Sequence, residues 1–79
     1  EIDLTLSLRA CVILREEYPQ TALSIKRMQG TAKYRFRTTV YDLKPVSRFV
    51  MGFLGEIKIN GSPAFKRHIR EQIAKLMKL

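Results

Sequence analysis

Apolar and polar residues alternate along several short segments of the chain, and this alternation predicts β-strands. The clearest segment is Ala32–Tyr41, with the sequence AKYRFRTTVY. Its even-numbered residues, Tyr34 and Phe36 among them, predict the buried side of a half-buried strand. Its odd-numbered positions include three cations spaced about 7 Å apart along the strand: Lys33, Arg35 and Arg37. Because like charges repel, this side requires water, acidic neighbours or an anionic partner.

Three further segments show the same alternation. The first strand is predicted to begin at Ile2 and to end at Ser7 or Leu8. The second is predicted over Ala22–Gln29, with Leu23 and Ile25 pointing inward and Ser24 and Lys26 pointing outward, and the fourth over Glu56–Asn60. Gly30 can adopt a positive φ, so we expect the second and third strands to form a hairpin.

Helical spacing of apolar residues separates these strands. RACVILREEY, from Arg9 to Tyr18, predicts a first helix, with Ser7 as its N-cap and Pro19 ending it. LKPVSRFVMGFL, from Leu43 to Leu54, predicts a second.

We expect Asp42 to cap that second helix and Gly55 to take the left-handed position at its end. Ser62 and Pro63 predict the N-cap and first residue of a third helix. The apolar stripe of this third helix comprises Phe65, Ile69, Ile73 and Leu76.

The predicted order is therefore β-α-β-β-α-β followed by one more helix. Two right-handed β-α-β crossovers around a hairpin predict an α+β fold of the ferredoxin-like type. This fold is a sandwich in which helices cover one face of a four-stranded antiparallel sheet and leave the other open. We expect residues 1–79 to form one such domain. A strand pattern already begins at residue 2 without an initiator Met, so we expect a domain taken from a longer protein.

Charge and cysteine content narrow the functional classes. The net charge is +8 and the sequence pI is about 10.2, which favours contact with phosphate-rich or acidic partners. Cys11 is the only cysteine, which excludes an internal disulfide and fits a reducing, cytoplasmic compartment. No apolar run approaches the length of a membrane span.

The sequence offers little for catalysis. His68 is the only histidine, and the residues around it in the sequence are mostly basic, so no Ser-His-Asp or Cys-His set is visible nearby. One cysteine and one histidine do not make a typical zinc site. We therefore expect no enzymatic activity, no metal and no cofactor.

The open sheet face is the candidate functional site. Its candidate anion- or nucleic-acid-binding residues are Lys26, Lys33, Arg35, Arg37 and Lys58. Cations on such a surface attract phosphates whatever the base sequence. RNA-recognition folds of this topology also expose aromatic residues for base stacking, whereas Tyr34 and Phe36 are predicted to point inward here. A solvated basic face, or one covered by another domain, is the simpler interpretation.

The chain also resembles the C-terminal extension domain of WYL-domain transcription regulators. The resemblance spans nearly all 79 residues. It rests on IDLTLSLRACVILRE, on the hairpin around Gly30, and on the closing run YDLKPVSRFVMGFLGEIKINGSPAFKRHIREQIAKL, with its Gly55 and Pro63. It implies a regulatory domain of a bacterial DNA-binding protein, acting in dimerisation and effector sensing, with DNA bound by a separate N-terminal domain. It also implies a homodimer and a nucleic-acid or nucleotide effector.

Two other functions remain open from the residues themselves. The first is a small nucleic-acid-binding module that acts through the basic sheet face. The second is a module of the ACT type, in which paired subunits hold a small metabolite at their interface.

Overall fold

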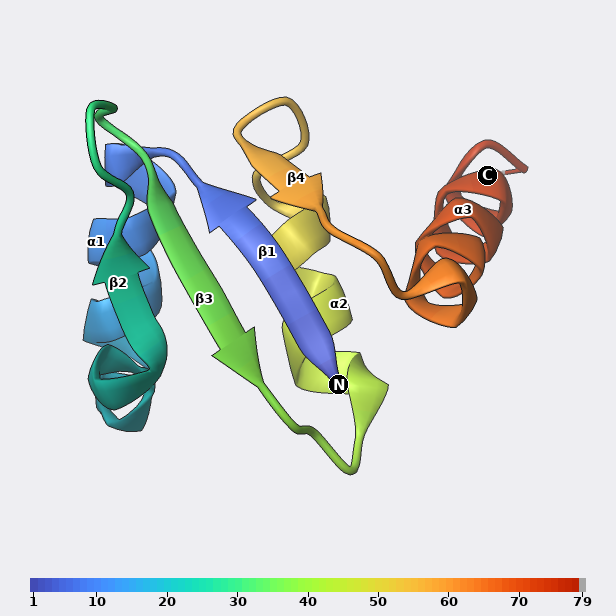
Figure 1. Ribbon diagram of the computed structural model, residues 1–79. Helices are drawn as coiled ribbons and strands as arrows, with labels where there is room; N and C mark the ends of the chain where they lie inside the picture. The colour runs from blue at the N-terminus through green and yellow to red at the C-terminus, as the bar shows by residue number, and fades with distance from the viewer. Residues whose placement is uncertain (79) are drawn as a thin grey trace.

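The computed structural model of the protein describes residues 1–78 and is built on a four-stranded sheet (Figure 1). Its strands are β1 (Ile2–Leu6), β2 (Ile25–Arg27), β3 (Tyr34–Thr38) and β4 (Ile57–Ile59). Its helices are α1 (Leu8–Glu17), the 3₁₀-helix η1 (Pro19–Ser24), α2 (Leu43–Met51) and α3 (Pro63–Leu76). The strand order is β2-β3-β1-β4, and every neighbouring pair is antiparallel. This confirms the predicted ferredoxin-like sheet with an added C-terminal helix.

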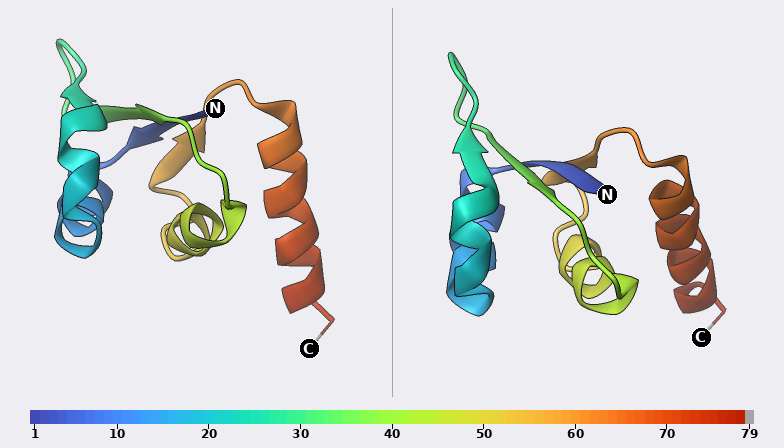
Figure 2. Two further views of the ribbon diagram at one scale, coloured as in Figure 1. Left: turned by 90° about the horizontal axis from the view of Figure 1, so that it is seen from below. Right: turned by 60° about the horizontal axis from the view of Figure 1, so that its bottom comes forward.

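The helices lie on one side of the sheet (Figure 2). α1 and α2 run beneath the strands, and α3 lies beside α2, beyond the edge formed by β4. No helix of residues 1–78 covers the opposite face of the sheet. That uncovered surface is called the open face below.

The core lies between the sheet and the helices. Leu4 and Leu6 of β1 are completely buried, and Phe36 of β3 sits directly opposite Leu4. The alternation predicted for the first and third strands is therefore correct. The other buried apolar residues are Ile2, Ala10, Cys11, Leu14, Phe49, Val50, Phe65 and Ile69.

Both ends of α1 follow the sequence-based prediction. The Ser7 hydroxyl accepts a hydrogen bond from the Ala10 backbone N–H at 3.1 Å, which satisfies a group that has no partner within the helix. The helix ends at Glu17, and the N–H of Tyr18 donates to the carbonyl of Leu14. Pro19 then begins η1.

The second strand is the main correction. The prediction of a strand over Ala22–Gln29 is wrong for its first half, because Pro19–Ser24 forms η1 and only Ile25–Arg27 joins the sheet. Leu23, predicted to point inward, is 95% exposed. The Thr21 N–H and hydroxyl both donate to the Tyr18 carbonyl, at 2.9 and 2.7 Å, and these local bonds keep the chain turned.

The hairpin between β2 and β3 is confirmed but its strands are shorter than predicted. Gly30 has a φ of +73°, as expected for its turn. β3 covers Tyr34–Thr38 rather than Ala32–Tyr41. Lys33 therefore precedes the strand, although its carbonyl still accepts from the Met28 N–H at 2.9 Å.

The last two helices differ from prediction at their ends. Asp42 caps α2 as expected, but the helix ends at Met51 rather than Leu54, and Gly55 takes its positive φ in the turn that follows. Ser62 precedes α3 without capping it through its side chain; its backbone is left-handed and its hydroxyl donates to the Glu1 carbonyl. Leu76 is 55% exposed, so the buried stripe of α3 stops before it.

Candidate functional site

The strand register aligns part of the predicted basic cluster in a single row across the open face. Lys26 of β2 lies opposite Arg35 of β3, Arg35 lies opposite Thr5 of β1, and Thr5 lies opposite Lys58 of β4. Because neighbouring strands are about 4.8 Å apart, the row extends over about 14 Å. We call these four residues the cross-strand row.

Asp3 neutralises the centre of this face. The Arg35 guanidinium binds its carboxylate through two hydrogen bonds, Nη2 to Oδ2 at 2.6 Å and Nε to Oδ1 at 3.0 Å. Arg35 and a further bond from Asn60 lower the pKa of Asp3, whereas desolvation opposes them. The residues that carry this pair are not exact partners in the register, since Asp3 lies opposite Arg37.

Asn60 extends the network to the fourth strand. Its Nδ2 donates to the Thr5 hydroxyl oxygen at 2.8 Å and to Oδ1 of Asp3 at 3.3 Å. Its backbone N–H donates to the Asp3 carbonyl at 2.8 Å and so continues the pairing of β4 with β1. The middle of the open face is therefore a connected polar network rather than an exposed positive charge.

Arg37 is held more loosely. Its guanidinium lies 3.7 Å from the Asp3 carboxylate and 3.8 Å from that of Glu1, and its side chain is 54% exposed. Contacts this long in solvent contribute little to stability. Arg37 thus keeps most of its capacity to bind an external anion.

The predicted lysines lie around this neutral centre. Lys26 and Lys58 occupy the two edge strands, and Lys33 lies in the turn before β3. All three are exposed, and none forms an ion pair with another residue of the range 1–78. The structure therefore separates the five predicted residues into one neutralised arginine and four available cations.

The carboxylate of Glu56 is already bound by Ser7 and Arg9. The Ser7 hydroxyl donates to it at 3.0 Å, and Arg9 binds it with an Nη2–Oε2 distance of 2.8 Å. The bond from Arg9 is the main cause of its lowered pKa. Arg9 also lies over the Phe53 ring, 5.0 Å from its centroid. Glu56 thus neutralises Arg9 rather than the predicted lysines.

The sequence-based prediction missed Asp3 and Asn60 as members of this site. The partners that bring them into the site are far away in the chain: Asp3 and Arg35 are 32 residues apart, and Asn60 and Asp3 are 57 residues apart. The available signal was parity, since Asp3 shares its side of β1 with Thr5.

The geometry favours binding of phosphates over stacking of bases. Tyr34 and Phe36 point to the helix side, as predicted, and Tyr41, which is fully exposed, lies beyond the end of β3. The open face therefore presents ammonium and guanidinium groups but none of the aromatic residues of β3. Such a surface attracts anions through charge.

Other groups with chemical potential are isolated. Cys11 is buried, and its burial raises the thiol pKa, which makes it a poor nucleophile. Within the described residues, no three His, Cys, Asp or Glu side chains gather closely enough to hold a metal ion. None of the helices in this range is long and apolar enough to cross a membrane.

No family model, curated protein or solved structure matches this chain.

Proposed function

We propose that this chain is a regulatory domain of a bacterial WYL-type transcription regulator, and that its open face binds a polyanionic effector. The cross-strand row carries the proposal, because it places cations on both edges of a sheet surface that the helices leave uncovered. The ferredoxin-like topology is also the one that the family resemblance implies.

The distribution of charge indicates an extended partner. Lys26 and Lys58 lie at opposite edges, about 14 Å apart at the backbone, with the Asp3–Arg35 pair between them. One phosphate contacts at most one edge, whereas a chain of phosphates contacts both. A single-stranded nucleic acid provides such a chain, and binding through its backbone is independent of base sequence.

In this proposal the regulator's other functions lie elsewhere. A separate N-terminal domain reads DNA, and the domain described here dimerises and senses the effector. An effector of this kind acts only by binding one assembly state more tightly than another. We therefore expect the polyanion to change the mass of the domain in solution.

The second candidate is a simple nucleic-acid-binding module. The net charge of +8 on 79 residues favours it, because a nonspecific module requires little more than a cationic surface. The two candidates differ in assembly: the simple module binds as a monomer and its mass changes only by that of the ligand.

Binding of labelled single-stranded DNA to the chain across a salt series tests the proposal. Replacing Lys26 and Lys58 together by serine removes two phosphate contacts, so the slope of log K against log salt falls by about 1.4. The matched control replaces Arg67 and Arg70, two exposed cations of α3, by serine and leaves the slope unchanged. Equal losses in the two double variants would place binding in the overall charge rather than the open face.

Analytical ultracentrifugation of the same samples separates the two candidates. A mass that doubles or halves with DNA supports the regulatory domain. A mass that rises by one oligonucleotide per monomer supports the simple module.

A further inference from the structure

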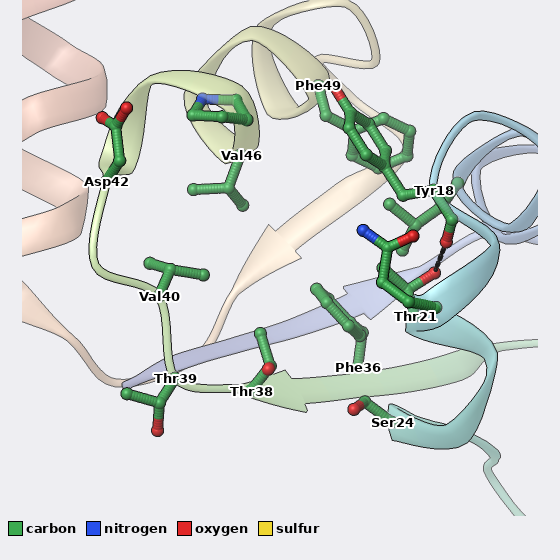
Figure 3. Close-up of a pocket in the computed structure, with 13 residues that line it drawn as sticks. Tyr18, Thr21, Ser24, Phe36, Thr38, Thr39, Val40, Asp42, Val46 and Phe49 are labelled. Atoms are coloured by element: carbon green, nitrogen blue, oxygen red, sulfur yellow. Dashed lines mark hydrogen bonds between the residues drawn. The ribbon is translucent and has the colours of Figure 1, made fainter.

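A cavity of about 300 Å³ opens on the helix side of the sheet, where β3 ends and α2 begins (Figure 3). One wall comes from the end of α1 and from η1, a second from β3 and the segment after it, and a third from α2. Val46 of α2 points toward Val40, and Phe36 points from β3 into the space beneath α2. Other apolar lining residues are Leu14, Tyr18 and Phe49.

The charge of this lining is unusual for the chain. Of 79 residues, 15 are lysine or arginine, yet none of the thirteen lining residues is basic. Asp42 is the only one with a charged side chain. Its Oδ1 accepts from the Lys44 backbone N–H at 3.0 Å, and its Oδ2 accepts no hydrogen bond within residues 1–78. Thr38, Thr39 and Gln20 add neutral polar groups.

The walls are held in place by local bonds. η1 keeps its turn through the two hydrogen bonds from Thr21 to the Tyr18 carbonyl, one of which appears in Figure 3. Pro45 stiffens the first turn of α2, which lines the opposite wall. A cavity between two such fixed walls is formed before any ligand arrives, which reduces the entropy lost on binding.

We propose that this cavity binds a small organic amine with an apolar body. Its volume lies at the lower end of ligand sites, which suits a single ring on a short chain. The apolar lining buries the ring, and the carboxylate of Asp42, which lies exposed at the outer margin of the cavity, attracts the ammonium group. No lining residue carries a positively charged side chain that would pair with an acid. This ligand class differs from the anions attracted by the open face, so the cavity is a second, independent site.

Three probes that share a ring but differ in charge test the proposal on the full chain. They are 2-phenylethylamine, 2-phenylethanol and phenylacetate, each titrated while backbone amide signals are followed by NMR. We expect the amine to bind at least about tenfold more tightly than the acid, with the alcohol between them. The shifts should concentrate in η1, around Val40 and in the first turn of α2. Equal affinities for amine and acid would overturn the proposal, as would shifts confined to the open face.

Asp42→Asn tests the charge alone. Asparagine is as good an N-cap as aspartate, so α2 is expected to keep its start. The variant should lose the preference for amine over acid and still bind the alcohol. If the preference survives in a folded variant, the Asp42 carboxylate is not its source and the proposal fails.

Val40→Phe tests the location by filling the opening. All three probes should lose binding, whereas Leu23→Phe, at an exposed position outside the lining, should leave it intact. Thermal unfolding of both variants checks that they fold. The last outcome comes from the unliganded protein over a range of concentrations. Sedimentation reports its self-association, and amide spectra of the same samples report which residues are affected. If self-association shifts the same amide signals as the amine, the occupant is a second copy of the chain and the proposal is wrong.

Discussion

The two faces of the sheet are formed by the same strands but are stabilised by different forces. On the helix side, Leu4, Leu6 and Phe36 remove apolar surface from water. On the open face, Asp3 and Arg35 remain in contact with solvent and are held by hydrogen bonds and charge. Neighbouring residues of one strand, such as Leu4 and Thr5, therefore belong to different environments.

The two faces contribute unequally to the stability of the domain. A buried leucine stabilises the domain by a large amount, because its removal leaves a cavity that packing fills only partly. An exposed ion pair contributes little, because water screens both partners and side-chain entropy opposes their pairing. The helix side therefore determines whether the chain folds, whereas charges on the open face can change at little cost to stability.

Leu4→Ala is the strongest test of this difference. We expect it to lower the free energy of unfolding by about 2–5 kcal/mol, as for other fully buried leucines. A domain of this size has only about 4–12 kcal/mol in total, so the variant is close to unfolding. Urea denaturation followed by circular dichroism measures the loss.

Thr5→Ala is the matched control, one residue along the same strand. It removes the hydroxyl that accepts from Asn60, so we expect a loss of about 1 kcal/mol. A loss as large as that of Leu4→Ala would show that the two faces do not differ in this way.

The centre of the sheet was predictable from sequence and its margins were not. Alternation in β1 and β3 assigns Leu4 and Phe36 to the core without knowledge of their partners. The prediction of the second strand was wrong in its first half, because the alternating pattern around Leu23 is compatible with both a strand and the turned backbone of η1. The choice between them depends on hydrogen bonds made by Thr21, which the apolar pattern does not register.

The candidate site was predictable only in part for a related reason. Exposure of Lys26 and Lys58 follows from parity alone. Arg35 and Asp3 are 32 residues apart in the chain. Their contact could be predicted only from the register in which β1 pairs with β3. The cavity is lined in part by η1, so the same unpredicted turn that shortened β2 also made the cavity unpredictable from the sequence.

The hydroxyl groups of Ser7 and Ser62 provide a comparison in which the expected loss of stability is intermediate. The sequence predicts both Ser7 and Ser62 as N-caps, but only Ser7 accepts a bond from a helical N–H. Ser7→Ala removes this cap and also the hydrogen bond that the hydroxyl donates to Glu56, so it should lower the free energy of unfolding by about 0.5–2 kcal/mol. Ser62→Ala should have an effect of about 0.5 kcal/mol or less, because its hydroxyl bonds only to the Glu1 carbonyl. Similar losses in urea denaturation would mean that the hydroxyl of Ser7 does not act as a cap.

Low pH is expected to reduce the stability of the domain by removing the charges of carboxylates around the open face. We expect this loss to be smaller than those of the substitutions above. The pKa values of Asp3 and Glu56 are lowered in the folded state, chiefly by hydrogen bonds from Arg35 and Arg9. The folded state therefore binds protons less readily than the unfolded state. The stability contributed by these carboxylates is present above their unfolded pKa values, near 4, and is lost as the pH falls through the lower folded values.

The urea midpoint should accordingly stay constant from about pH 7 to pH 5 and decline below about pH 4. Asp3→Asn should flatten this decline, because the variant has no carboxylate at the centre of the face. Glu71→Gln, on α3, removes a carboxylate that forms no ion pair within residues 1–78 and serves as the control. If both variants decline alike, the Asp3–Arg35 pair adds no stability.

The same Asp3→Asn variant should bind single-stranded DNA more tightly at neutral pH, since it frees Arg35 for a phosphate. That result would show that the Asp3–Arg35 pair, which contributes little to stability, weakens the binding of phosphates.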